Sequence, residues 1–465
     1  MAENTTADNT QNTARNSAHP DANAGQNGQQ AQQTQQAQDV TLTMRQVEPT
    51  AIETELDNSW REANASALAS GVHAGTRNSV MTLLTYTGGD DQTRRALTAI
   101  EAMTAQHPSR AILVAPQRDR DGAPIEAYIA TQMQNITGAP SYGEEIVIKA
   151  HDGAVPHLPG VLLPLIVSGL PSFLWWMGEP PWRSEAFEAL IDGSDRLIVD
   201  TSEMRQAERS LLALEDLMRR KKSSCAISDF NASRQQPWRE LVAQFFDGPD
   251  QRAWLSSIDR VTIEYAAGAE DDPENPAQAY LFAGWLASRL GWRILGGGGS
   301  QGGDESRLHT LASQTNQKIT LELNARYGVA QASWLDITAA FAKVQLAQAA
   351  QMQAALPAEN EPHDHAHPQG KPTVGPGALM MVALHATVNG QMGTFTVARE
   401  ADLEHASTLA QLPQGAPPSQ TVHLPTLGEA LLLADQLQQL EHDTLYEESL
   451  TMAAQLINPS LRRNR

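Results

Sequence analysis

The feature that most constrains the fold of this chain is a long apolar stretch between residues 158 and 181. Ser168-Gly169 divides it into a first part with helical character and a second part that ends in Trp175-Trp176. A second helix pattern, Phe187–Leu190, and a second strand pattern, Arg196–Asp200, follow it. The order helix, strand, helix, strand predicts part of an α/β layer. No reactive group interrupts the stretch, so it offers neither a nucleophile nor a metal ligand.

The segment before this stretch predicts more of the same layer. Strand, helix and strand patterns follow one another at Thr76–Tyr86, Asp90–Gln106 and Ser109–Ala115. This order favours parallel strands joined by a right-handed crossover. Ile125–Ile136 and Glu144–Lys149 alternate apolar and polar residues, which is typical of antiparallel or edge strands. We therefore expect an α/β domain over residues 46–200, with a parallel or mixed sheet and flanking helices.

The rest of the chain mixes helix and strand patterns. Helix patterns lie at Glu203–Lys222, Pro237–Asp247, Pro276–Leu290, Pro425–Leu440 and Tyr446–Leu456. Strand patterns lie at Arg260–Tyr265, Lys318–Leu323, Ala378–Asn389 and Gly393–Ala398, the last two joined by Asn389-Gly390, a favoured hairpin turn. These patterns predict a second α/β or α+β domain over residues 201–457. We expect flexible segments at 296–304 and 350–376 to interrupt it, and residues 458–465 to fray.

The beginning of the chain lacks core-forming residues. Residues 1–45 are rich in Gln and Asn and contain no Val, Ile, Leu, Phe, Tyr or Trp before Val40. Such a segment cannot bury enough apolar surface to offset its ordering entropy, so we expect a disordered tail.

Charge and hydropathy exclude some classes of partner. The net charge is −21, from 33 basic and 54 acidic residues, whereas a nucleic-acid binder needs a cationic surface. No apolar run reaches the roughly 18 residues of a membrane span, and no signal pattern opens the chain. We expect a cytoplasmic protein with no membrane and no nucleic-acid partner.

Few residues suggest metal or phosphate chemistry. The single cysteine, Cys225, allows neither an internal disulfide nor a cysteine-based zinc site. His363–His367 alternates His and Asp and suits zinc or nickel, but its Pro-rich surroundings favour a solvated linker, because metal sites need preorganised ligands. Gly296–Gly303 matches no phosphate-loop spacing, which favours a flexible connection.

No catalytic constellation stands out. The nucleophile-elbow pattern Gly-x-Ser-x-Gly is absent. Asp200 ends a predicted strand at the sheet edge where α/β proteins bind ligands, but Asp200-Thr-Ser also fits a helix N-cap, and we favour the cap.

Tryptophan and arginine give the remaining signal, because both residue types anchor protein interfaces. Trp175 and Trp176 point to opposite faces of a predicted strand, so both are buried only if both faces are covered. The pairs Trp182-Arg183 and Trp238-Arg239 stand where elements begin, which favours exposure of their side chains. The candidate partner contacts are Trp175, Trp176, Trp182, Arg183, Trp238 and Arg239, with core packing as the alternative.

Several segments together resemble the OpcA-type glucose-6-phosphate dehydrogenase assembly proteins. They are Leu162–Pro181, Arg196–Thr201, Asp229–Asn231, Pro237–Leu241 and Gly284–Trp292, together with Thr76–Val80, His107–Arg110 and Leu445–Leu450. The resemblance covers about residues 46–300 and 377–457. It implies a non-catalytic protein without a cofactor, which binds the dehydrogenase oligomer, activates it and supports the oxidative pentose phosphate pathway and NADPH supply. Photosynthetic members use paired cysteines as a redox switch, which the lone Cys225 cannot form.

Two other functions remain open from the sequence. One is a sugar-phosphate enzyme, such as a lactonase-like hydrolase, that uses the sheet edge near Asp200 and Asp229. The other is metal binding through His363–His367.

Overall fold

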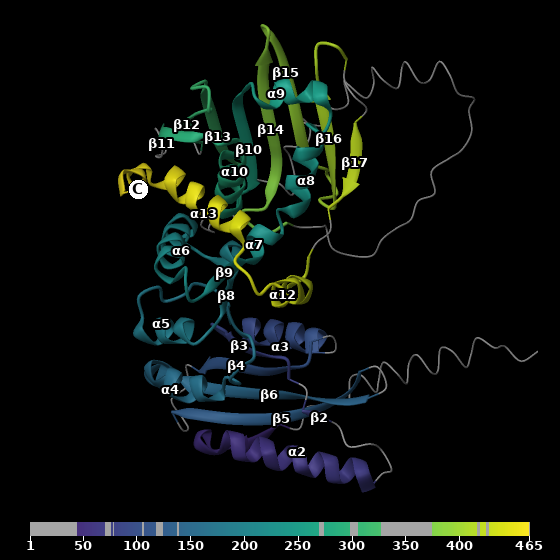
Figure 1. Ribbon diagram of the computed structural model, residues 1–465, viewed down its shortest axis with the longest axis vertical. Coiled ribbons are helices and arrows are strands. Elements are labelled where there is room, and N and C mark those ends of the chain that lie inside the picture. Colours follow the sequence, from purple (N-terminus) through teal and green to yellow (C-terminus); the bar gives the residue numbers. More distant parts are fainter. Residues whose placement is uncertain are drawn as a thin grey trace, which may run out of the picture. The chain divides into compact units, whose positions relative to one another are not determined.

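The computed structural model describes residues 44–69, 76–77, 79–104, 107–117, 124–136, 139–268, 274–297, 306–326, 374–415, 419–424 and 427–464. The chain divides into two compact units, residues 1–45 and 46–465, and the second is described below (Figure 1). The expected tail before residue 44, residues 298–304, residues 350–373 and His363–His367 lie outside the described residues. No helix of the described residues is long and apolar enough to cross a membrane.

The first sheet has the order β5-β6-β4-β3-β7-β8-β9. Its strands are β3 (Met81–Tyr86), β4 (Ser109–Gln117), β5 (Ile125–Ile136), β6 (Ala139–His151), β7 (Ser172–Trp176), β8 (Arg196–Val199) and β9 (Ala226–Asp229). The short strand β2 (Thr76–Arg77) pairs with β6, and β1 (Arg45–Val47) opens the described chain. Strands β6, β4, β3, β7, β8 and β9 are parallel, and β5 is antiparallel to β6.

This order confirms the predicted α/β layer with a mixed sheet. The chain runs from the central strand β3 outward to β4 and β6, then crosses back to β7 and continues outward to β8 and β9. This is the doubly wound arrangement, in which the strand order reverses between β3 and β7. The sheet continues past residue 200, because β9 pairs with β8, so the expected domain boundary lies within it.

Helices flank this sheet (Figure 1). They are α2 (Ile52–Ala69), α3 (Asp90–Thr104), α4 (Leu158–Leu162), α5 (Glu185–Asp192), α6 (Ala207–Lys221) and α7 (Phe230–Ser233). The next helix, α8 (Gln236–Gln244), packs on the second sheet. Short 3₁₀ turns join the flanking helices at Pro49–Ala51, Asp152–His157, Leu163–Leu165 and, as η4, Thr201–Glu203. The predicted helix Glu203–Lys222 is therefore a 3₁₀ turn followed, after a short connection, by α6.

The second sheet has the order β11-β12-β13-β10-β14-β15-β16-β17. Its strands are β10 (Ile258–Ala266), β11 (Arg293–Gly297), β12 (Ser306–Ala312), β13 (Lys318–Arg326), β14 (Leu379–Val388), β15 (Gln391–Arg399), β16 (His405–Gln411) and β17 (Gln420–His423). Only β10 and β13 are parallel. The predicted hairpin is confirmed: β14 and β15 pair around Asn389-Gly390, whose φ angles of 52° and 77° fit a type I′ turn.

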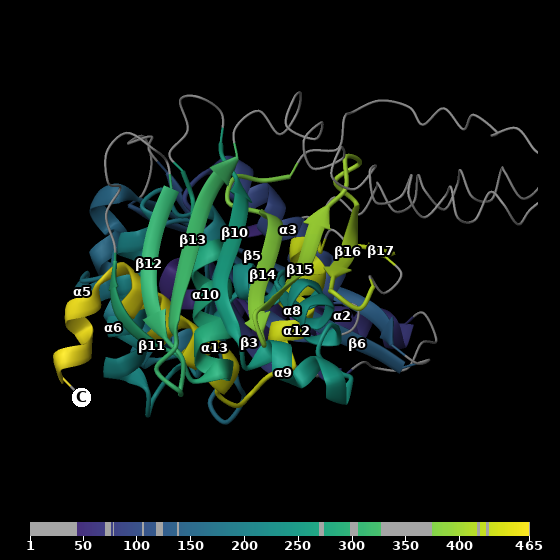
Figure 2. The ribbon, with the colours of Figure 1, turned by 90° about the horizontal axis from the view of Figure 1, so that it is seen from above.

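The remaining helices are α9 (Arg252–Leu255), α10 (Ala277–Leu290), α12 (Glu429–Leu437) and α13 (Thr444–Ile457), with 3₁₀ turns at Pro249–Gln251 and Pro459–Asn464. Of these helices, α9, α10 and α13 pack against the second sheet or against one another, and α12 packs against α3 and α7. Figure 2 shows α8, α10 and α13 behind the strands of this sheet. Gly291 ends α10 in the left-handed conformation, with a φ of 63°. The last 3₁₀ turn, Pro459–Asn464, lies in the segment expected to fray, and that expectation stays a prediction.

One hydrophobic core joins the two sheets. It includes Leu174 and Val199 of the first sheet, Val261 and Ile263 of the second, and Phe282 of α10, all at most 1% exposed. Because the core is continuous, the carboxyl edge of the first sheet is held against the rest of the chain.

Candidate functional site

The carboxyl ends of β3 and β7 form the point where doubly wound sheets bind their ligands. Tyr86 ends β3 and pairs with Trp176, which ends β7. The two rings stack with centroids 3.9 Å apart and an interplanar angle of 7°. Phe187 packs edge-on against Trp176 at 4.8 Å. Aromatic side chains of the protein itself therefore occupy this position.

Gln92 fills the adjoining space between the loops that follow these strands. Its Oε1 accepts a 2.5 Å hydrogen bond from the backbone N–H of Gly88, after β3. A Cβ added to Gly178, after β7, would lie 3.1 Å from Gln92 Nε2. The same amide nitrogen donates to Glu203 Oε2 at 3.4 Å. One side chain thus spans the loops after β3, β7 and β8.

The first helix after β3 is also unsuited to a phosphate. In dinucleotide-binding folds the pyrophosphate lies at this helix N-terminus, where backbone N–H groups and the helix dipole attract anions. Here α3 begins with Asp90 and Asp91, whose carboxylates stabilise the helix and repel an anion. The start of α3 therefore favours its own acidic side chains over a bound phosphate.

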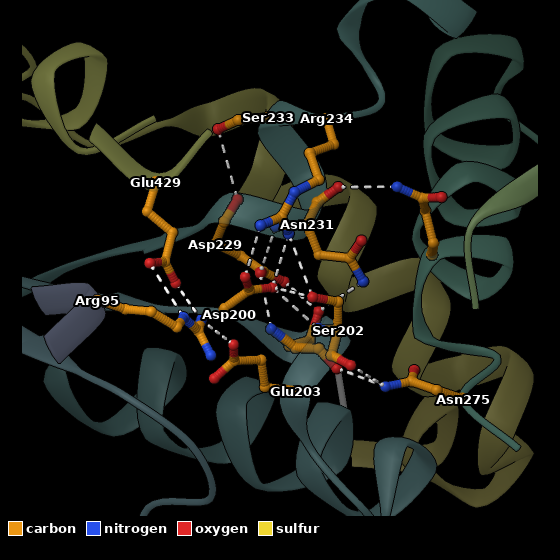
Figure 3. A network of polar contacts seen from close by, with 12 residues as sticks. Arg95, Asp200, Ser202, Glu203, Asp229, Asn231, Ser233, Arg234, Asn275 and Glu429 are labelled. Atoms are coloured by element: carbon orange, nitrogen blue, oxygen red, sulfur yellow. Dashed lines mark hydrogen bonds and ion pairs between the residues drawn. The ribbon is translucent and has the colours of Figure 1, made fainter. Parts of the chain in front are cut away.

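Asp200 lies at the carboxyl end of β8 and is 7% exposed in its side chain. Its Oδ1 accepts from Ser202 N at 3.0 Å, so the predicted N-cap is confirmed, with η4 rather than a long helix as the capped element. Both carboxylate oxygens also accept from Arg234, at 2.8 Å each. Figure 3 shows Asp200, Ser202 and Arg234 directed toward one another.

Asp229 lies at the carboxyl end of the neighbouring strand β9 and is fully buried. Its carboxylate accepts from Thr201 N at 3.0 Å, Thr201 Oγ1 at 2.6 Å and Asn231 N at 2.9 Å. Burial, and then the nearby Asp200, raise its pKa to about 7. Asp229 therefore binds a proton much more readily than an exposed aspartate.

Arg95 of α3 connects the same edge to α12. Its guanidinium forms ion pairs with Glu203 of η4 and Glu429 of α12. Burial raises the pKa of Glu203, although Arg95 opposes that change. Figure 3 shows Arg95 between the two carboxylates.

Two amide side chains attach this edge to the second sheet. Asn275 Nδ2 donates to the backbone oxygens of Thr201, Ser202 and Met204, at 2.9, 2.9 and 3.2 Å. Gln278 Oε1 accepts from Leu379 N, at the start of β14, at 2.7 Å. The polar groups at the carboxyl edge therefore hold two parts of the chain together.

Three of the predicted contact residues are in the core. Trp175, Trp176 and Trp238 are 1%, 4% and 2% exposed. Trp175 packs against Phe230, and the guanidinium of Arg399 lies 5.7 Å from the ring centroid of Trp238. As folded, these three residues offer a partner no surface, because both faces of β7 are covered and α8 turns Trp238 inward.

The other three remain accessible. Trp182 is half-buried: its Nε1 donates to Glu179 Oε1 at 2.9 Å, and its ring meets Phe187 edge-on at 6.2 Å. Arg183 is exposed. Arg239 is half-buried and donates to the backbone oxygen of Ala232 at 3.2 Å. Of the six expected contact residues, these three keep exposed surface, and their contact with a partner stays a prediction.

The described residues contain no group of three or more His, Cys, Asp or Glu placed to hold a metal ion. Cys225 is buried, and burial raises the pKa of its thiol to about 12. A thiol with this pKa is almost entirely protonated at neutral pH and therefore unreactive.

Sequence reasoning missed Arg95, Glu429 and Arg234. The Arg95 and Glu429 side chains meet across 334 positions of sequence, and Asp200 and Arg234 across 34. In the sequence, each of these three residues looks like an ordinary surface charge. Only the folded arrangement shows which residue each of them pairs with.

The fold and this edge define an α/β protein whose doubly wound sheet is closed by its own side chains. Two family models match the chain: the glucose-6-phosphate dehydrogenase subunit N-terminal domain over residues 100–216, and the C-terminal domain of the same subunit over residues 225–450. The chain belongs to this family, the OpcA-type glucose-6-phosphate dehydrogenase assembly proteins.

Relatives in cyanobacteria carry the name OxPP cycle protein OpcA. That of Nostoc punctiforme is 34% identical over 227 residues, which is 48% of this chain and 46% of the relative. That of a Synechocystis species is 34% identical over 197 residues, 41% of this chain and 39% of the relative. These matches span about half of the length of the curated relatives or less. Among solved structures, a UDP-N-acetylglucosamine 3-dehydrogenase from Acidithiobacillus ferrooxidans aligns with this chain with a TM-score of 0.38 and 10% sequence identity. The alignment covers 81% of this chain and 96% of that one. This likeness is too distant to indicate function.

Proposed function

We propose that this chain is a non-catalytic assembly factor and allosteric activator of glucose-6-phosphate dehydrogenase, and that it supports the oxidative pentose phosphate pathway and NADPH supply. The observation that carries the non-catalytic part is the closed carboxyl edge. Tyr86 and Trp176 stack at the carboxyl ends of β3 and β7, and Gln92 bridges the loops after these strands, at the edge where a doubly wound sheet binds a dinucleotide. Membership of a family described as a subunit of the dehydrogenase supports the choice of partner.

The rival proposal, a lactonase-like hydrolase near Asp200, has less support. A general base or nucleophile must reach its substrate. Asp200 is instead bound by Arg234 and Ser202, and Asp229 is fully buried and bound by Thr201 and Asn231. Both carboxylates stabilise turns of the chain itself.

An activator of this kind needs only a difference in affinity. A protein that binds the active oligomer of the dehydrogenase tenfold more tightly than other forms shifts the equilibrium by about 1.4 kcal/mol. Trp182 and Arg183 suit such a contact. Trp182 is held in place by Glu179 and Phe187, and a rigid aromatic next to an accessible arginine is typical of interface anchors.

The test is the activity of the dehydrogenase from the same organism, followed as NADP reduction over a range of glucose-6-phosphate concentrations with and without this chain. We expect a saturable fall in apparent KM or a rise in rate, together with co-elution of the two proteins. Arg183→Glu should weaken both effects. Arg94→Glu is the matched control, because Arg94 is an exposed arginine on α3 at 75% side-chain exposure.

Three results would contradict the proposal. No effect on the dehydrogenase and no co-elution would remove the activator function. Turnover of 6-phosphogluconolactone by the isolated chain would favour the hydrolase instead. A thermal shift of the isolated chain on addition of NADP would show that the carboxyl edge is open to a dinucleotide.

A further inference from the structure

A cavity lies between helices α6, α10 and α13, away from the carboxyl edge of the first sheet. Helices α6 and α13 pack side by side (Figure 1). Residues of one side of α6, of the first half of α13 and of the last turn of α10 line the cavity, which has a volume of about 440 Å³. This volume is within the range of sites that bind small molecules. The fold does not fill this space with its own side chains, so it is a candidate binding site.

The most informative residue of this cavity is Glu215 of α6. It lines the cavity and is only 8% exposed. Its carboxylate forms no hydrogen bond or ion pair with another residue that the structure describes. A carboxylate that is taken out of water without a partner is costly, so buried carboxylates are almost always paired. Glu215 therefore marks a position in the cavity where a cation would be stabilised.

The other charges around the cavity favour a cation over an anion. Arg219 binds Asp216 at 2.6 Å and is 63% exposed in its side chain. Lys222 is 73% exposed, and its Nζ lies 3.9 Å from Glu447. Glu447 is 8% exposed, like Glu215, so the charges that the fold buries here are carboxylates, whereas the two basic groups extend into solvent.

Between the charged groups the wall is apolar. Met218 follows Glu215 by one turn of α6, and Met452 faces it from α13. Methionine side chains are flexible and polarizable, so they adapt well to an alkyl chain. Ser288 lies in the last turn of α10, where the carbonyl groups of a helix end carry partial negative charge and favour a cation. The cavity thus combines a free carboxylate with an apolar wall.

We propose that this cavity binds a small aliphatic amine. The ammonium group pairs with the carboxylate of Glu215, and the alkyl chain packs along Met218 and Met452. The ammonium group supplies the partner that Glu215 lacks, and the alkyl chain covers the methionine side chains. The proposal does not depend on the dehydrogenase as a partner.

The experiment is NMR of the full chain with ¹³C-labelled methionine methyl groups, titrated with n-pentylamine. About 0.15 M salt screens general attraction of a cation to this acidic chain. We expect saturable shifts of the methyl signals of Met218 and Met452, assigned by exchange to leucine, with a Kd of about 1 mM for so small a ligand. Met392, which is 78% exposed on β15, should not shift and is the internal control. n-Pentanol, which has the same chain without the charge, should bind at least tenfold more weakly.

A pair of variants tests the carboxylate. Glu215→Gln keeps the shape of the side chain and removes its charge, so the Kd for n-pentylamine should rise at least tenfold. Glu62→Gln removes an exposed charge from α2 and is the matched control, with an unchanged Kd. Circular dichroism checks that both variants are folded. The comparison of the amine with the alcohol uses the wild-type chain, so it tests the charge even if a variant does not fold.

Four outcomes would overturn the proposal. One is an absence of methyl shifts at Met218 and Met452 up to about 20 mM amine, well above the expected Kd. Another is n-pentanol that binds as tightly as n-pentylamine, which would make the cavity a purely apolar one. A third is a Glu215→Gln chain that binds the amine as the wild type does. The fourth is a wild-type chain that takes no free amine but loses co-elution with the dehydrogenase in Glu215→Gln, which would assign the cavity to a basic side chain of that enzyme.

Discussion

Helices α10 and α13 cross so closely at Gly284 that a single methyl group should destabilise the protein. A Cβ added at Gly284 would lie 2.9 Å from the backbone nitrogen of Ala453 and closer still to the backbone oxygen of Ser449. Real Cβ atoms essentially never approach within 3.0 Å of another heavy atom, and both neighbours here belong to the backbone. Gly284→Ala therefore requires α13 to move away from α10 along its whole contact.

The magnitude follows from two opposing effects. Overpacking of a core by one methyl group costs about 1–3 kcal/mol. The exchange of glycine for alanine inside a helix returns about 1 kcal/mol through helix propensity. Because both clashing neighbours are backbone atoms, the packing cost lies in the upper part of that range, about 2–3 kcal/mol. We therefore expect Gly284→Ala to lower the free energy of unfolding by about 1–2 kcal/mol.

Gly160 provides a matched control. It lies within α4, and a Cβ added there meets nothing within 4 Å. Gly160→Ala should raise the free energy of unfolding by about 0.5–1 kcal/mol, because only the propensity effect remains. Urea unfolding followed by tryptophan fluorescence, together with scanning calorimetry, measures both variants. A Gly284→Ala protein as stable as the wild type, or stabilised as Gly160→Ala is, would refute the close crossing.

Three further predictions concern buried groups. The pKa of Asp229 is raised to about 7 from 3.8, so its protonated form stabilises the fold fully below about pH 3.8 and this contribution is lost as the pH rises through 7. Asp229→Asn should therefore flatten the fall of Tm between about pH 4 and 7, measured by calorimetry, and an unchanged slope would contradict the raised pKa. Arg234→Met leaves the Asp200 carboxylate without its ion pair and should lower the free energy of unfolding in urea by about 2–3 kcal/mol. Arg94→Met removes an exposed pair and should lower it by less than about 0.5 kcal/mol. Equal losses in the two variants would argue against a buried pair at Asp200. Iodoacetamide should alkylate Cys225 at least about a hundredfold more slowly in the native chain than in urea, because the thiolate is the nucleophile and the buried thiol stays protonated. Mass spectrometry measures the labelling, and rapid labelling of the native chain would place the thiol at the surface.

The parts of the fold that the sequence predicted are those with a strong apolar or turn signal. The strands β3, β4 and β7 are almost wholly buried and read as continuous apolar runs, which is typical of parallel strands covered on both faces. The turn at Asn389-Gly390 was predictable because this dipeptide tolerates the positive φ angles of a type I′ turn.

Two of the missed strands, β16 and β17, carry a weaker pattern. β16 reads His-Ala-Ser-Thr-Leu-Ala-Gln, and β17 has four residues of which three are exposed. Small and polar residues contribute little apolar signal, and strand preference depends on the neighbouring strands against which they pack. These strands form because β15 offers a ladder for β16, and β16 offers one for β17.

The tryptophan residues show that the sequence could not predict which side chains are exposed to a partner. Trp238 stands at the start of α8, where exposure was expected, but Arg399 of β15 covers its ring. Trp175 and Trp176 belong to one strand with two covered faces, so adjacent tryptophans are both buried. A local pattern identifies residue types that often anchor interfaces. Only the packing of distant elements decides whether such a side chain is buried in the core or exposed to a partner.

The carboxyl edge of the first sheet shows how a ligand-binding arrangement becomes a structural junction. A ligand at that edge would need the polar groups that Asn275 and Gln278 already occupy, and each hydrogen bond that it displaced would cost about 1 kcal/mol. Asn275 holds three carbonyl groups of the turn after β8, and Gln278 holds the first residue of β14. To open the edge, the chain would have to separate its two sheets and expose their shared core. The same interactions that complete the fold therefore oppose a ligand at the carboxyl edge, and partner surfaces must be sought elsewhere on the molecule.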